Sequence, residues 1–312
     1  MKNQKMIEIY IKLILLVILS IILINLRIDT NRNNIKYYKQ LNNYNQKRES
    51  YAPLNPNNCN NSNNIKWNIY NITSFNDINK INISKLSFIL KDKKVSILGD
   101  SISTFEGYSN NDIDTNDTIG DNKIYYNGNN YITDVNDTWW MKTANKIGFE
   151  ILVNNSWSGD RVTKRGQTRN VELHDNTGDN AGTNPNIIIV YLGINDFRHN
   201  VTINIFKESY NQMIKNMINR YPEADIFLFN YVPNDSNTRT LEELEEYNEV
   251  VKNTAEKYNC TLVDLYNESG INETTMYSFM GDLTALHPNI EGMQAISDVL
   301  IDSLISKYVY NN

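Results

Sequence analysis

The chain has 312 residues, of which 40% are hydrophobic and 11% aromatic, enough to bury a sizeable core. Its formal net charge is −6, from 30 basic and 36 acidic residues that are interspersed along the sequence. Because a surface that binds nucleic-acid phosphates needs clustered Lys and Arg, this balance argues against a nucleic-acid partner.

Residues 1–27 are predicted to form a membrane segment. An apolar run extends over residues 9–26, and its eighteen residues would span roughly 27 Å as a helix, close to the hydrocarbon thickness of a bilayer. No small-residue cleavage site follows the run, which favours an uncleaved signal anchor over a removed signal peptide. We therefore expect the rest of the chain to be membrane-anchored outside the cytoplasm, or secreted if the segment is cleaved.

Residues 28–90 are predicted to be a linker or stalk. Asparagine makes up about one residue in six of the whole chain and about one in three of residues 28–66, which show no apolar periodicity. Cys59 lies in this segment, and the only other cysteine is Cys260. Two such distant thiols cannot form a metal site on their own, but they could form one disulfide, or Cys260 could lie unpaired in the core.

Residues 91–312 are predicted to form one α/β domain. Short apolar runs rich in Val, Ile, Leu and Phe, typical of strands buried on both faces of a parallel sheet, occur at 95–98, 150–155, 187–193, 225–232 and 261–266. Amphipathic helix patterns lie between and after them, at 138–148, 206–221, 241–258 and 293–308. Strands that alternate with helices indicate βαβ units and a parallel sheet with right-handed crossovers.

Polar residues follow the predicted strands at the points where the strands end. Ser101 comes just after the first run, and Gly159 follows the second. Asn195 follows the third, while Asp282 and His287 lie between the fifth run and the final helix. Because ligands of open parallel sheets bind beyond the carboxyl ends of the strands, we expect these residues to gather in one site.

These residue types suit acyl transfer. A serine hydroxyl such as that of Ser101 needs a nearby base to take its proton, and His287 is a suitable base near neutral pH. A carboxylate such as Asp282 would orient the imidazole, while Gly159 N–H and the Asn195 amide would stabilise a developing oxyanion. Each residue taken alone could equally be an ordinary turn residue, so the interpretation depends on the combination.

Four short blocks resemble those of the SGNH/GDSL hydrolases, and they occur in that family's order over about residues 93–305: Gly99-Asp100-Ser101, Gly159, Gly193-Ile194-Asn195-Asp196 and His287-Pro288. The resemblance implies a three-layer α/β/α flavodoxin-like fold with a five-stranded parallel sheet. It also implies ester hydrolysis without a metal or other cofactor. Ser101 would be the nucleophile and His287 the base, and the Ser101 N–H, Gly159 and Asn195 would form the oxyanion hole.

The expected acid departs from the family pattern. The family usually carries it three residues before the histidine, where this chain has Thr284, whereas Asp282 stands five residues before. A two-residue expansion of the loop would bring Asp282 to the imidazole. The alternative is a Ser–His pair whose imidazole is held by a backbone carbonyl.

The substrate is expected to be an ester of a small molecule or a glycan. Trp139, Trp140 and Trp157 lie near the blocks and could stack on sugar rings, or they could belong to the core. The combined blocks look most like those of bacterial members that deacylate carbohydrates, so we expect removal of acetyl or other short acyl groups. The alternatives are a lipase or arylesterase of the same family, and a non-catalytic, membrane-anchored glycan-binding protein.

Overall fold

The computed structural model describes residues 75–109, 124–175, 182–236 and 238–310. The chain divides into two compact units, 1–70 and 71–312, and all of the described residues belong to the second unit. The predicted membrane segment at 1–27, most of the predicted stalk, and Cys59 lie outside the described residues. Within the ranges that are described, no helix is both long and apolar enough to cross a membrane.

Five parallel strands form a single sheet, as the sequence predicted. In chain order they are β1 (Lys94–Gly99), β2 (Glu150–Ser156), β3 (Ile187–Tyr191), β4 (Asp225–Phe229) and β5 (Thr261–Val263). Their order across the sheet is β2-β1-β3-β4-β5, the flavodoxin-like arrangement. Every residue of β3 is buried, which explains its continuous apolar run. The chain crosses to the other side of the sheet between β2 and β3, so the crevice that such folds use for ligands opens at the carboxyl ends of β1 and β3.

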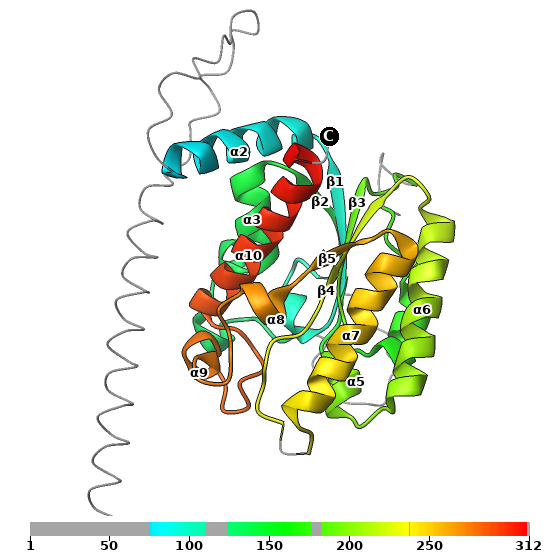
Figure 1. Cartoon of the computed structure of the whole chain (residues 1–312). Helices are drawn as coiled ribbons and strands as arrows, with labels where there is room; N and C mark the ends of the chain where they lie inside the picture. Colours follow the sequence, from blue (N-terminus) through cyan, green and yellow to red (C-terminus); the bar gives the residue numbers. More distant parts are fainter. Residues whose placement is uncertain (1–74, 110–123, 176–181, 237, 311–312) are drawn as a thin grey trace, which may run out of the picture. The chain divides into compact units, whose positions relative to one another are not determined.

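Helices cover both faces of the sheet (Figure 1). One face carries α2 (Phe75–Leu90), α3 (Trp139–Ile147) and α10 (Ile290–Ile305), which contact one another, and the other carries α6 (Ile203–Arg220) and α7 (Leu241–Tyr258). The shorter helical segments are η3 (Ser101–Ser103), η4 (Asn129–Tyr131), η5 (Val135–Asp137), η6 (Val162–Gly166), α4 (Gln167–Arg169), α5 (Ile194–Arg198), α8 (Leu265–Glu268), α9 (Met276–Phe279) and η8 (Ser306–Tyr310). The result is an α/β/α sandwich.

Local sequence signals set the ends of these helices. Helix α7 begins with a capping box, in which the Thr240 side chain accepts from the Glu243 N–H and the Glu243 carboxylate accepts from the Thr240 N–H. Helix α3 begins at Thr138, whose hydroxyl accepts from Met141 N–H, and it ends at Gly148 in the left-handed conformation.

Helix α2 corrects the predicted linker boundary. Residues 28–90 were expected to form a linker, but Phe75–Leu90 is a helix that packs against α3 and α10. Leu86 and Leu90 are buried, and the buried Asn82 amide donates to the Tyr310 hydroxyl over 2.5 Å. The buried positions recur every four residues, but one of them is an asparagine, so the apolar periodicity is weak. The folded domain therefore extends at least to residue 75.

Candidate active site

Ser101 is presented by a tight turn at the carboxyl end of β1. The Asp100 carboxylate caps η3 by accepting from Ile102 N–H over 3.0 Å. A side chain at Gly99 would meet the Ser103 Oγ at 2.7 Å and the Ser156 Oγ at 2.8 Å, so the chain can turn this tightly only with glycine there. Ser101 is 4% exposed. Its turn is held by hydrogen bonds within the turn's backbone and by the hydrogen bond that the Asp100 side chain accepts.

His287 lies against Ser101, on the loop that leads into α10. Its Nε2 is 2.9 Å from the Ser101 Oγ. The loop is held by backbone hydrogen bonds from Gly281 N–H to the His287 carbonyl and from Asn289 N–H to the Phe279 carbonyl. The Asn289 side chain then caps α10 by accepting from Gly292 N–H. A serine hydroxyl and an imidazole that are far apart in sequence are thus within hydrogen-bond reach, which is the arrangement that a nucleophile and its base need.

Asp282 reaches the other side of the imidazole despite its five-residue spacing. Its Oδ2 is 2.5 Å from His287 Nδ1, and it also accepts from His287 N–H over 3.2 Å. The extra residues form a turn around the carboxylate, in which Leu286 N–H donates to Oδ1 over 2.9 Å and Ala285 takes a positive φ of 45°. This turn is the two-residue expansion that the sequence required.

The charge of Asp282 determines which ring nitrogen of His287 donates a hydrogen bond and which accepts one. Burial raises the pKa of Asp282, but hydrogen bonds from the His287 side chain and from Leu286 N–H outweigh it, and the net pKa is lowered. The carboxylate is therefore ionised at neutral pH and accepts from Nδ1–H. In the neutral imidazole this leaves Nε2 to accept the proton of the Ser101 hydroxyl.

Gly159 and Asn195 line the same cavity as Ser101 and His287. This cavity has a volume of about 290 Å³, and its other lining residues are Ile124, Tyr125, Asn129, Ser158 and Leu286. Gly159 follows β2 with a φ of 70°, a conformation that favours glycine. Asn195 lies in the first turn of α5, the helix that follows β3, and its amide donates to the Asp160 carbonyl over 3.0 Å. The structure thus brings together all five residues that the sequence placed at the strand ends.

Three buried carboxylates support these loops: Asp100 and Asp196, which belong to the sequence blocks, and Asp160, which the sequence analysis did not single out. Burial raises the pKa of Asp100 to about 7, with Asp160 and Asp196 adding to the effect. Asp196 accepts from Val162 N–H over 2.7 Å, and Asp160 pairs with Arg169 over 3.3 Å. Among the residues that the structure describes, no group of three or more His, Cys, Asp or Glu side chains is arranged to hold a metal ion.

The three tryptophans proposed for sugar stacking belong to the core. Trp139 is fully buried and packs edge-on against Tyr191 and Phe229. Trp140 is 1% exposed, and Trp157 is 6% exposed beneath the Arg169 guanidinium, which lies 4.2 Å from the ring centroid. Because solvent barely reaches these rings, they offer no face to a sugar. The core alternative is correct for all three.

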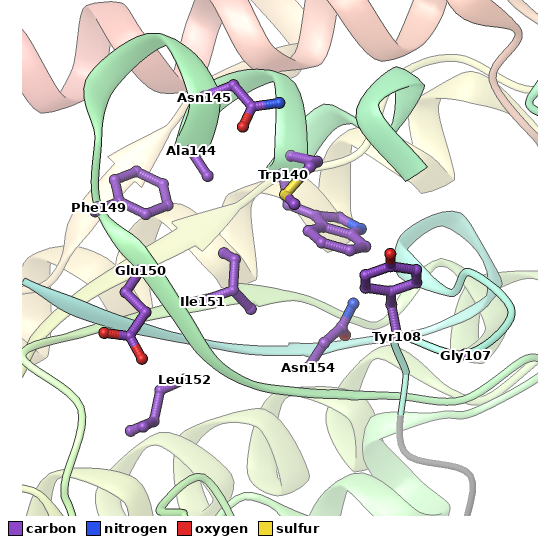
Figure 2. Close-up of a pocket in the computed structure, with 11 residues that line it drawn as sticks. Gly107, Tyr108, Trp140, Ala144, Asn145, Phe149, Glu150, Ile151, Leu152 and Asn154 are labelled. Carbon is purple, nitrogen blue, oxygen red and sulfur yellow. The ribbon is translucent and has the colours of Figure 1, made fainter. Parts of the chain in front are cut away.

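A second cavity lies apart from this site, between α3 and the edge strand β2 (Figure 2). It is larger, at about 480 Å³, and is lined by residues that include Tyr108, Trp140, Ile151 and Asn154. It contains none of the residues that line the Ser101 cavity. Trp140 Nε1 and Asn154 Nδ2 both donate to the Ser103 carbonyl, so these two residues brace the end of the turn that presents Ser101. The smaller cavity is therefore the candidate active site.

Solved structures of other proteins are similar to this chain. A protein from Bacteroides ovatus described as a GDSL-like lipase is 24% identical, with 71% of this chain and 100% of that chain covered and a TM-score of 0.50. A protein of the same description from Bacteroides uniformis is also 24% identical, with 69% and 97% covered and a TM-score of 0.48. A psychrotrophic esterase from Pseudoalteromonas is 17% identical, with 71% and 100% covered and a TM-score of 0.48. At 24% identity and a TM-score of 0.50, the Bacteroides ovatus protein is shown to share the fold alone.

No curated protein sequence matches the chain. Residues 97–295 match the sequence profile of the GDSL-like lipase/acylhydrolase family. The match covers well over half of the chain and contains Ser101, Gly159, Asn195, Asp282 and His287. The chain belongs to the GDSL-like lipase/acylhydrolase family and is a carboxylic ester hydrolase.

Proposed function

We propose that the protein hydrolyses esters through Ser101, with His287 as general base and Asp282 as the carboxylate that orients it. One observation carries this proposal: the continuous hydrogen-bond chain from the Ser101 Oγ to His287 Nε2, at 2.9 Å, and from His287 Nδ1 to the Asp282 Oδ2, at 2.5 Å. A nucleophile, a base and an orienting group in this sequence are what acyl transfer from an ester needs.

The proposed reaction has two steps. The Ser101 Oγ attacks the ester carbonyl carbon while its proton passes to His287 Nε2, and Asp282 stabilises the imidazolium that forms. The carbonyl oxygen becomes an oxyanion, for which the N–H groups of Ser101 and Gly159 and the Asn195 amide are the donors. The alcohol leaves with the proton from Nε2. Water then attacks the acyl-enzyme with His287 again as base, which releases the acid and restores Ser101.

We propose a short acyl group, acetyl above all, on a polar alcohol such as a carbohydrate. The cavity supports this, because it is small and its lining includes the polar side chains of Asn129, Ser158 and Asn195. The resemblance of the sequence blocks to those of carbohydrate-deacylating members supports it as well. The three tryptophans do not support it, because they are buried and cannot stack on a sugar ring.

The first experiment compares the full chain with Ser101→Ala and with Ser278→Ala, a matched change at an exposed serine. We expect p-nitrophenyl acetate hydrolysis to disappear in Ser101→Ala and to persist in Ser278→Ala, with unchanged circular dichroism and with no effect of EDTA. Equal rates in wild type and Ser101→Ala would remove Ser101 from the mechanism. A folded, inactive wild type would favour a glycan-binding role.

A second experiment tests the substrate class with wild type alone. We expect kcat/KM to fall from p-nitrophenyl acetate to the butyrate and further to the decanoate, and we expect acetate release from acetylated oligosaccharides. A preference for the decanoate would indicate a lipase-type enzyme and contradict the short acyl group.

A further inference from the structure

Tyr125 lies flat against the imidazole of His287. The centroids of the two rings are 3.6 Å apart, and their planes are nearly parallel, at 9°. Tyr125 belongs to residues 124–131, a segment between α3 and the turn of Asp100–Thr104, which we call the nucleophile turn. It lines the cavity that contains Ser101. No other aromatic ring stacks face to face on a histidine among the described residues.

The same segment holds the backbone of the histidine loop. The Asn130 amide donates to the His287 carbonyl over 2.9 Å, and the Tyr126 hydroxyl donates to the Pro288 carbonyl over 2.9 Å. Tyr126 is fully buried, so its hydrogen bond is shielded from water. Asn130 also packs so closely on Gly281 that a side chain could not be accommodated at that position. The loop therefore has a rigid support beneath His287.

The other attachment of this segment is to the nucleophile turn. Tyr125 N–H donates to the Thr104 Oγ1 over 2.9 Å, and the Thr104 hydroxyl donates in turn to the Ser101 carbonyl over 2.9 Å. Glu106 N–H also donates to the Tyr126 carbonyl over 3.0 Å. One short segment thus connects the residue proposed as nucleophile with the residue proposed as base, independently of the hydrogen bond between them.

The stacked ring supplies a restraint that the hydrogen bonds on His287 lack. Hydrogen bonds at Nδ1 and Nε2 hold the two ring nitrogens in place. They oppose only weakly a rotation of the imidazole plane about the line through those two atoms. A ring in contact with its face blocks that rotation. Such contacts between aromatic rings also contribute favourable energy beyond the burial of area, and an aromatic face attracts a cation such as the imidazolium that forms during acyl transfer.

We propose that Tyr125 is a positioning residue for His287, which holds the imidazole in the plane that serves Ser101 and Asp282 and stabilises it when it takes up the proton. The inference rests on the proposed function. It predicts an effect on kcat and not on KM, because the imidazolium exists only after the substrate has bound.

The test measures kcat and KM of the full chain for p-nitrophenyl acetate in Tyr125→Phe, Tyr125→Leu and Tyr125→Met. We expect kcat to fall about three- to tenfold in the Leu and Met variants, the factor that a ring contact of this kind is worth. We expect Tyr125→Phe to restore it to near wild type, because the ring is kept. Tyr131→Leu is the matched control, since Tyr131 lies in the same segment but is 78% exposed. Labelling of Ser101 by a fluorophosphonate gives a second rate that depends on His287.

The outcomes separate the two proposals. A wild type that neither hydrolyses the ester nor reacts with the fluorophosphonate would overturn the proposed function, and the role of Tyr125 with it. An active wild type with equal kcat in all variants would overturn the role of Tyr125 alone. A rise in KM at constant kcat would mean that the ring contacts substrate. Unfolding of both variants without a ring would mean that Tyr125 serves the fold, which also counts against the proposal.

Discussion

Replacement of Asp282 by asparagine tests the residue whose spacing departs from the family pattern. Asparagine keeps the size of the side chain and can still accept from Leu286 N–H, so the turn around it should survive. It removes the negative charge next to His287 Nδ1, which is 2.5 Å from the carboxylate. The perturbation is therefore mainly electrostatic.

The size of the effect follows from this geometry. Two opposite charges whose centres are about 4 Å apart interact by about 4 kcal/mol at an effective dielectric constant of about 20, and that energy corresponds to about 10³ in rate. Loss of the correct imidazole tautomer adds to this, and the same change in Ser-His-Asp enzymes lowers kcat by about 10⁴. We expect kcat for p-nitrophenyl acetate to fall by about 10³ to 10⁴, with little change in KM.

The assay compares wild type, Asp282→Asn and Asp92→Asn. Asp92 is an exposed turn residue with a φ of 73°, which asparagine tolerates, so this control should keep full activity. Urea unfolding of each protein shows whether the fold is intact. If Asp282→Asn keeps more than about a tenth of the wild-type kcat, the electrostatic reasoning is wrong. A Ser–His pair without carboxylate assistance would then be the better description.

Further predictions concern the oxyanion hole, a buried acid and a tight turn. Asn195→Ala should lower kcat by about 10² to 10³ with KM nearly constant, and a change confined to KM would exclude it as an oxyanion donor. Asp100 has a pKa of about 7 when folded but an ordinary value near 3.8 when unfolded. Its contribution to the free energy of unfolding should therefore be largest below pH 4 and should decrease by up to about 1.4 kcal/mol per pH unit as the pH rises towards 7. Asp100→Asn should lack this decrease in urea unfolding at pH 5 and pH 7, and parallel curves for the two proteins would contradict the raised pKa. Gly193→Ala should yield little folded protein on size-exclusion chromatography, because Gly193 has a φ of 137° and its Cβ would overlap the Tyr231 hydroxyl. Normal yield and Tm would refute this.

The sheet was predictable because a strand that is buried on both faces must be apolar throughout. The run at 187–193 became β3 (Ile187–Tyr191) for this reason. The run at 261–266 gave a shorter strand, because the Asp264 side chain accepts from Asn267 N–H and begins a helix instead. Helix α2 could not be predicted in the same way. Its buried face includes an asparagine, Asn82, whose amide donates to a tyrosine near the other end of the chain, Tyr310.

The part of the site that lies at the ends of the strands was predictable, because the sheet topology determines where those ends meet. Residues that follow parallel strands meet at one edge of the sheet, so the proximity of Ser101 and Asn195 needed no further information. The reach of Asp282 depends on the backbone of a turn with a positive φ at Ala285, which no sequence pattern announces. Tyr125 lies in a segment without periodicity, and only tertiary structure brings it to His287. The sequence likewise did not indicate whether the rings of Trp139, Trp140 and Trp157 point towards the site or into the core.

Two buried acids hold the backbone around the candidate site. Burial raises the pKa values of Asp100 and Asp196 and so opposes their ionisation, and burial of an ionised carboxylate costs free energy even when it accepts hydrogen bonds. Asp100 accepts from the N–H of Ile102, next to Ser101. Asp196 accepts from the N–H of Val162, at the end of the loop that carries Gly159. Backbone N–H groups that must point at an oxyanion have to be fixed before the substrate arrives. The chain thus places buried carboxylates beside Ser101 and beside the loop that carries Gly159, and we expect substitutions that relieve their burial to stabilise the protein while lowering kcat.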